Sequence, residues 1–123
     1  MKSQIKVYEY AQCSTCKKAL KFLDSKKVDY KKIPIVDQPP TMAELKLMLK
    51  HLKAAGKTFK NLFNTSGVQY RELGISEKIK NGMTEDEALK LLSQNGKLIK
   101  RPFVLSDHGG AVGFQEQDLK ALI

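Results

Sequence analysis

Two cysteines, Cys13 and Cys16, are the residues whose type and spacing are most typical of a chemical site in this sequence of 123 residues. They form a C-x-x-C motif, in which one thiolate can attack a disulfide and the second sulfur can resolve the mixed disulfide. The motif reads Cys13-Ser14-Thr15-Cys16. A strand before it and a helix after it would favour a thiolate, because the first turn of a helix has unpaired N–H groups and a positive dipole end. With Lys17 and Lys18 adding positive charge, we expect Cys13 to be the nucleophile and Cys16 the resolving cysteine.

Other roles for the two cysteines are a buried apolar contact and a zinc site. Cys16 falls on the apolar stripe of the helix expected after the motif, and free cysteine often behaves as a small buried hydrophobe. A zinc site would need two more ligands, and the only histidines, His51 and His108, have no zinc-finger spacing, so we expect no metal. We expect His51 to be exposed or at the edge of the core and His108 to lie in a solvated turn. Neither histidine is placed by the sequence to act as a base for Cys13.

The segments around the motif predict a strand–helix–strand unit. Alternating apolar residues predict a strand over Ile5–Tyr8, and an apolar stripe at helical spacing predicts a helix over Cys16–Ser25. A second strand is predicted over Val28–Ile35, and Pro34 favours an edge position, because proline cannot donate a hydrogen bond to a neighbouring strand. Since a crossover helix joins the two strands, we expect them to be parallel.

A helical insertion is predicted over about residues 41–98. It opens with a capping box at Thr41 and Glu44, and a second capping box at Thr84 and Glu87 starts a later helix. The glycines expected to end or separate its helices are Gly56, Gly67, Gly74, Gly82 and Gly96, the last of them as a C-cap.

The end of the chain predicts a β-hairpin and a last helix. Strands over Phe103–Leu105 and Ala111–Phe114 flank a turn at 106–110, and an amphipathic helix follows over Gln115–Leu122. The order βαβ, helical insertion, ββα predicts one α/β domain over residues 1–123, with a four-stranded mixed sheet covered by helices.

The charge of the chain is unevenly distributed. The formal net charge is +9, and 20 of the 22 basic residues are lysines. Residues 1–60 contain 14 lysines and 5 acidic residues, whereas residues 61–123 contain 8 basic and 8 acidic residues, so the excess lies in the half with the cysteines. Base readout favours arginine, and no nucleic-acid-binding motif is visible, so we expect no direct nucleic-acid contact. The lysines form either a solvated surface or one that attracts anionic substrates or acidic partners.

The sequence also favours a cytoplasmic location. No run approaches the roughly 18 apolar residues of a membrane span. The first residues alternate charged and apolar side chains and lack the apolar core of a secretory signal. In the reducing cytosol a close cysteine pair is more often redox-active or metal-binding than a structural disulfide.

The segment from Val7 to Ala19, which contains both cysteines, resembles the start of the arsenate reductase (ArsC)/Spx family. Further matching segments lie at 61–67, 70–73, 100–102 and 112–114, so the resemblance spans nearly the whole chain. It implies a thioredoxin-like fold with a helical insertion and Cys13 as the nucleophilic cysteine. It also implies Arg101 beside the active-site sulfur and Pro102 at the position of the fold's cis-proline. The supporting residues of the expected site are Ser14, Thr15, Asn64 and Pro102.

The chain departs from the arsenate reductases that it resembles. Those enzymes carry two further arginines, one where this sequence has Asn64 and one in the C-terminal hairpin, where 112–114 has none. Arsenate is a multiply charged oxyanion that suits forked arginine donors. We therefore expect arsenate reduction to be weak or absent, and the resemblance is closer to uncharacterised ArsC-like members.

These features predict a thiol–disulfide oxidoreductase without a bound cofactor. Its reductant would be thioredoxin, or glutaredoxin with glutathione as thiol co-substrate. We expect the protein to be a monomer and to have no membrane partner. The alternative is an Spx-like redox-sensing transcriptional regulator that binds RNA polymerase. Gly56 could match a glycine used at the Spx interface, whereas the end at Ile123, without the longer tail of Spx, argues against this alternative.

Overall fold

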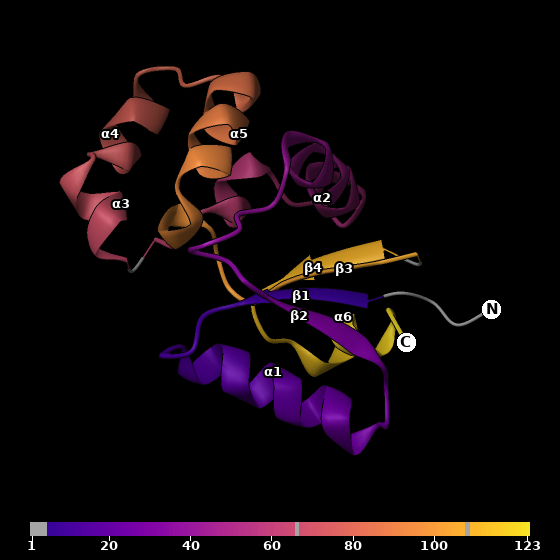
Figure 1. The fold of residues 1–123 in the computed structure, drawn as a ribbon. Coiled ribbons are helices and arrows are strands. Elements are labelled where there is room, and N and C mark those ends of the chain that lie inside the picture. Colours follow the sequence, from indigo (N-terminus) through magenta and orange to yellow (C-terminus); the bar gives the residue numbers. More distant parts are fainter. Residues whose placement is uncertain (1–4, 66, 108) are drawn as a thin grey trace.

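A four-stranded mixed sheet forms the centre of the structure (Figure 1). The computed structural model describes residues 5–65, 67–107 and 109–123. The strands are β1 (Ile5–Glu9), β2 (Tyr30–Pro34), β3 (Phe103–Ser106) and β4 (Gly109–Val112), in the order β2-β1-β3-β4. β1 pairs parallel to β2 and antiparallel to β3, and β3 pairs antiparallel to β4. The predicted α/β class, the mixed sheet, the parallel pair and the edge position of the strand with Pro34 are confirmed.

Helices cover both faces of this sheet (Figure 1). α1 (Ser14–Ser25) and α6 (Glu116–Lys120) lie on one face, below the sheet in this view. The helices between the second and third strands are α2 (Met42–Ala54), η1 (Phe59–Leu62), α3 (Val68–Glu72), α4 (Ile75–Lys80), α5 (Glu85–Gln94) and η2 (Gly96–Leu98), of which η1 and η2 are 3₁₀ helices. They form the predicted helical insertion and cover the other face. In the described part of the chain, no helix is long and apolar enough to cross a membrane.

Each face of the sheet buries its own apolar core. The core between the sheet and the helices α1 and α6 includes Ile5, Val7 and Leu23. Tyr8 points to the opposite face of β1 and belongs to the larger core beneath the helical insertion, together with Leu45 of α2. Burying one such aliphatic side chain contributes about 1.5–3 kcal/mol to stability. β1 is therefore held from both sides, and its C-terminal end leads directly to the cysteines.

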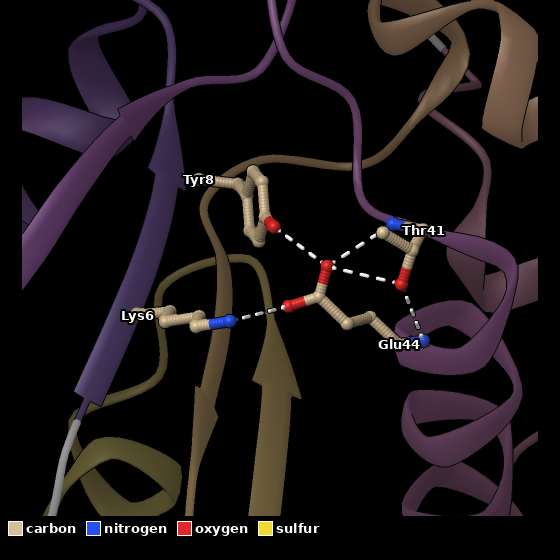
Figure 2. Close-up of polar contacts among 4 residues, drawn as sticks. All are labelled: Lys6, Tyr8, Thr41 and Glu44. Atoms are coloured by element: carbon tan, nitrogen blue, oxygen red, sulfur yellow. Dashed lines mark hydrogen bonds and ion pairs between the residues drawn. The ribbon is translucent and has the colours of Figure 1, made fainter.

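α2 is tied to β1 through Glu44 (Figure 2). The Thr41 hydroxyl accepts the Glu44 N–H at 3.1 Å, and the Glu44 carboxylate accepts the Thr41 N–H at 3.0 Å, so the predicted capping box is present. The same carboxylate accepts the Tyr8 hydroxyl at 2.7 Å and pairs with the Lys6 ammonium at 3.2 Å. Burial by itself would raise the pKa of Glu44, but these hydrogen bonds outweigh it and hold that pKa below its ordinary value. A carboxylate thus connects the helical insertion to the strand that positions the cysteines.

Gly96 does not have the predicted role of a C-cap. α5 ends at Gln94 with Asn95 as its C-cap, and Gly96 begins η2. A Cβ on Gly96 would lie 2.0 Å from the Ile35 carbonyl oxygen, so glycine is needed where the chain passes against the residue after β2. The prediction was wrong because this requirement comes from a residue that is distant in the sequence.

The hairpin is shifted relative to its prediction. β3 extends to Ser106 and β4 begins at Gly109, so the turn is shorter than 106–110. β4 ends at Val112 because Gly113 has a φ of +79°, in the left-handed region. α6 covers only the middle of the predicted helix at 115–122, and His108 lies outside the described residues.

Candidate active site

Cys13 is the N-cap of α1 and ends a tight turn after β1. Its N–H donates to the Tyr10 carbonyl oxygen at 3.0 Å, and its backbone is extended, with φ −90° and ψ 113°. The Cys13 sulfur accepts the Cys16 N–H at 3.2 Å, a bond that satisfies one of the unpaired amides of the first helical turn. Because Cys13 takes the cap position, α1 begins at Ser14, two residues before its predicted start. The strand, the C-x-x-C motif and the helix follow one another as predicted.

The two cysteines differ in exposure. Cys13 is half-buried, whereas Cys16 is completely buried among the apolar side chains of α1. Burial raises the pKa of Cys16 well above its usual range, and the hydrogen bond with the Cys13 side chain raises it further. The positive charge of Arg101 lowers the pKa of Cys16, but its effect is smaller than that of burial. At neutral pH Cys16 is therefore a protonated thiol, and Cys13 is the sulfur that a molecule in solution can reach.

Cys13 faces a cleft of about 700 Å³. Four segments that are distant in the sequence line this cleft. The first is the turn before α1 with the first residues of that helix, and the second is the helical insertion, which contributes Lys57, Asn64, Gly67 and Val68. The third is the pair Lys100 and Arg101 before β3, and the last is the region from Val112 to Gln115. The sheet and the helical insertion together therefore assemble the site, and no single local motif contains it.

Backbone pairing brings the helical insertion against the segment before β3. The Lys100 N–H donates to the Leu62 carbonyl oxygen at 2.8 Å, and the Asn64 N–H donates to the Leu98 carbonyl oxygen at 2.7 Å. These two bonds flank an isolated antiparallel bridge between Phe63 and Ile99. Asn64 is consequently fixed in the cleft that also contains Cys13.

Arg101 lies beside the turn that precedes Cys13. Its guanidinium carbon is 4.8 Å from the centre of the Tyr10 ring, a cation–π contact. The Arg101–Pro102 peptide bond is cis, as the resemblance implied, and Pro102 is buried. The Pro102 carbonyl oxygen accepts the Gly113 N–H at 2.9 Å, which joins the two C-terminal segments of the cleft wall.

Five of the seven predicted site residues line the cleft, namely Cys13, Ser14, Thr15, Asn64 and Arg101. The other two, Cys16 and Pro102, are buried and do not line it. The structure thus brings together residues that lie up to 88 positions apart in the chain, from Cys13 to Arg101.

Two lysines of the cleft were not predicted as site residues. Lys57 and Lys100 both line it, although the sequence indicates only that the lysines form a solvated surface or one that attracts anionic substrates or acidic partners. The position of Lys100 directly before Arg101 and Pro102 could have marked it as a site residue. No feature of the sequence around Lys57 would have done so. His51, half-buried on α2, lines a separate hollow of about 290 Å³ that contains no cysteine.

The fold and the cysteine site together define a known class of protein, and the chain belongs to the ArsC family. Residues 8–122 match the model of that family. The matched range contains both cysteines, the helical insertion and the C-terminal hairpin, so the predicted family membership is confirmed.

The chain is similar to relatives along its whole length. YusI of Bacillus subtilis, an uncharacterised protein, is 42% identical over 113 residues, which are 92% of this chain and 92% of YusI. A crystal structure of an ArsC family related protein from Bacteroides fragilis superposes with a TM-score of 0.87 at 41% identity, covering 100% of this chain and 98% of the other. These similarities confirm the thioredoxin-like fold of the ArsC family.

Relatives with a stated role are less similar. An arsenate reductase of Neisseria meningitidis is 25% identical, covering 98% of both chains. The regulatory protein MgsR of Bacillus subtilis is 28% identical, covering 99% of this chain and 92% of MgsR. The family around this chain therefore includes both enzymes and regulators, and similarity alone does not choose between them.

Proposed function

We propose that this chain is a thiol–disulfide oxidoreductase of the cytoplasm, with Cys13 as nucleophile and Cys16 as resolving cysteine. The observation that carries the proposal is the placement of the two sulfurs. Cys13 lies at the N-terminus of α1 in the cleft and its sulfur accepts the Cys16 N–H at 3.2 Å, while the Cys16 thiol is buried and protonated. An accessible sulfur next to a second, protected thiol is the arrangement that attack followed by resolution requires.

The proposed reaction transfers two electrons from the protein to a disulfide. The Cys13 thiolate attacks one substrate sulfur and forms a mixed disulfide, and the other substrate sulfur leaves as a thiolate that takes a proton from water. Cys16 then gives its proton to water and attacks the Cys13 sulfur, which releases the second substrate thiolate and leaves a Cys13–Cys16 disulfide. The substrate is reduced to two thiols. Glutaredoxin with glutathione, or thioredoxin, would reduce the protein disulfide again, with no bound cofactor.

The remaining site residues would support this exchange. Arg101 brings a positive charge beside the reacting sulfur and offers forked donors to an anionic group. Ser14 and Thr15 belong to the first turn of α1, whose N–H groups face developing negative charge. Asn64 and Pro102 would shape the site, the first as a cleft residue and the second through the cis peptide bond. We expect the protein to act as a monomer.

Disulfide mapping and cysteine variants test the proposal. Oxidised protein should contain a Cys13–Cys16 disulfide by mass spectrometry. With a small disulfide, Cys16→Ser should accumulate a mixed disulfide at Cys13, whereas Cys13→Ser should form no adduct. A limiting amount of alkylating reagent should label Cys13 first, because Cys16 is buried and its pKa is raised. First labelling at Cys16, or no mixed disulfide in Cys16→Ser, would contradict the assignment.

A second candidate is redox-sensing regulation through RNA polymerase, as the resemblance to Spx implies. The similarity to the regulator MgsR, which extends over 99% of this chain, favours it. In this case the Cys13–Cys16 disulfide would change the affinity of the protein for RNA polymerase and would not be part of a catalytic cycle. Binding of the reduced and oxidised protein to RNA polymerase, measured beside disulfide turnover, separates the candidates. Redox-dependent binding without turnover would favour the regulator, and turnover without binding would favour the enzyme.

A further inference from the structure

We infer that Lys100 is a specificity-determining residue, which makes the cleft prefer small disulfides that carry carboxylates. The inference rests on the proposed disulfide reduction and adds the substrate class. It is carried by the charge of the cleft lining, by the contact of Lys100 with the cleft wall and by the size of the cleft.

The charged side chains that line the cleft have a single sign. They belong to Lys57, Lys100 and Arg101, and none of the described lining residues is Asp or Glu. Among the described residues, no carboxylate forms an ion pair with any of these three cations. Positive charge that is not neutralised in a concave site raises the local concentration of anions. The cleft is therefore suited to a negatively charged substrate.

Lys100 differs from the many surface lysines because its side chain lies against a wall of the cleft. A Cβ on Gly113 would lie 3.0 Å from Cε and 3.8 Å from Nζ of Lys100, so the lysine fills the space of a side chain at position 113. The Gly113 N–H is fixed to the Pro102 carbonyl oxygen at 2.9 Å, and the Lys100 N–H is fixed to the Leu62 carbonyl oxygen at 2.8 Å. Lys100 and Gly113 both line the cleft that contains Cys13, so this exposed lysine lies along the cleft wall, where a ligand can reach it.

The size of the cleft and the chemistry of its cations indicate the ligand class. Its volume of about 700 Å³ falls within the roughly 300–1,000 Å³ typical of small-molecule sites. Arg101 can hold one carboxylate with paired hydrogen bonds, and a lysine binds another as a point charge. An oxidised low-molecular-weight thiol with several carboxylates matches this arrangement.

Lys100 would act on binding, whereas Cys13 carries out the exchange already described. An anionic disulfide would be concentrated near Cys13 by the Lys100 charge, and a neutral disulfide would not. The ratio of the two reduction rates therefore reports the role of Lys100. A change in the reactivity of Cys13 itself would alter both rates equally and leave the ratio unchanged.

Single-turnover reduction of two disulfides tests this role. Reduced protein is mixed with oxidised glutathione, which is anionic, or with bis(2-hydroxyethyl) disulfide, which is neutral. Lys100→Met should lower the anionic-to-neutral rate ratio by about two- to fivefold, the effect of one exposed ion pair. Lys60→Met is the matched control, since Lys60 is also exposed but does not line the cleft, and its ratio should equal that of the wild type. Added salt should narrow the preference of the wild type more than that of Lys100→Met.

An unchanged ratio in Lys100→Met, whether both rates stay the same or fall equally, would overturn the inference while leaving the proposed function intact. Melting temperatures check that the variants fold, and Lys100→Gln provides a second neutral variant. If the wild type reduces neither disulfide, the proposed function itself fails. Binding of S-methylglutathione still tests Lys100 in that case, because this compound has the carboxylates of glutathione but no reactive sulfur. It should protect Cys13 from neutral iodoacetamide more strongly in the wild type and Lys60→Met than in Lys100→Met. Equal protection in all three proteins would remove Lys100 from the site.

Discussion

Cys13 and Cys16 are three positions apart on one helix, and this spacing gives the two sulfurs different environments. The N-cap position leaves Cys13 at the cleft, while one helical turn carries Cys16 to the buried side of α1, the side of Ala19 and Leu23. Burial raises the pKa of the Cys16 thiol and shields it from solvent, as the proposed role of a resolving cysteine requires. At the scale of single residues, the proposed division of roles thus follows from where a helix begins.

Arg101 should increase the reactivity of Cys13. Arg101→Ala removes a positive charge from the lining of the cleft, so alkylation of Cys13 by the anionic reagent iodoacetate at neutral pH should be slower by severalfold. Arg101→Lys keeps the charge but loses the planar contact with Tyr10, so its rate should lie between those of Arg101→Ala and the wild type. The measurement is the rate of Cys13 alkylation across pH, with the melting temperature as a control for folding. Identical profiles in all three proteins would exclude Arg101 from the site.

Among the secondary-structure elements, α2 is the one that joins the helical insertion to the sheet. Its N-terminal Glu44 is both a capping residue and the partner of two side chains from β1, Tyr8 and Lys6 (Figure 2). Hydrogen bonds to a buried or partly buried charge are stronger than neutral ones. This carboxylate therefore stabilises the contact between the two structural units that enclose the cleft.

Glu44→Gln should lower the free energy of unfolding at pH 7 by about 1–3 kcal/mol, because a neutral amide replaces the charged acceptor. The pKa of Glu44 is lower in the folded protein than its ordinary value. Its stabilising contribution is therefore complete above the ordinary pKa and is lost as pH falls through the lower, folded pKa. Urea unfolding of wild type and variant should show a difference at pH 7 that shrinks as the pH is lowered below the ordinary pKa of a glutamate.

The second capping box provides the matched control for Glu44. Glu87 caps α5 from Thr84 in the same way, but among the described residues it forms no hydrogen bond or ion pair with another element. Glu87→Gln should therefore cost less stability than Glu44→Gln. Equal losses in the two variants would mean that the bonds to β1 add nothing beyond the cap.

Gly96 should tolerate no side chain. Gly96→Ala would place a Cβ against the Ile35 carbonyl oxygen, and the backbone of either segment would have to move. We expect a loss of about 1–3 kcal/mol, the usual cost of overpacking a tight contact. Denaturant titration of the variant measures this loss, and an unchanged midpoint would contradict the close approach of the two segments.

At the scale of the whole molecule, the cleft exists because the sheet and the helical insertion meet around it. The cysteines come from the first strand–helix unit, Asn64 from the insertion, and Arg101 from the segment before β3. The positive charge of the cleft likewise comes from separate regions, since Lys57 and Lys100 lie on different segments. The composition of the assembled cleft, and not any one motif, sets which anions it can hold.

This composition predicts that arsenate turnover is weak or absent. Arg101 is the only described arginine that lines the cleft. The resemblance would require two more, one where this chain has Asn64 and one in the C-terminal hairpin, where residues 112–114 include no arginine. Purified protein would be assayed with arsenate in the presence of glutathione with glutaredoxin, and separately with thioredoxin. The arsenate reductase of Neisseria meningitidis serves as the positive control. Robust turnover that disappears in Cys13→Ser would show that lysines and an amide can replace the missing arginines.

The sequence alone determined most of the elements and the position of the cysteine pair at the start of a helix. The strand before Cys13, the capping boxes at Thr41 and Thr84 and the parallel strand pair were all predictable. Caps and periodic patterns depend on interactions within one or two turns of the chain, which the order of residues records directly. The resemblance to the ArsC/Spx family added Asn64, Arg101 and Pro102, which no local pattern would have selected.

Only the tertiary structure decided which distant residues touch. Gly96 looked like a helix C-cap until the chain was seen to pass against Ile35, and Lys100 looked like one surface lysine among many until it was found against Gly113. Such contacts depend on how the sheet and the insertion pack, and this packing leaves no periodic signal in the sequence. The two cysteines could therefore be found by reading the chain, whereas the charge and shape of the cleft around them arise only when the chain folds.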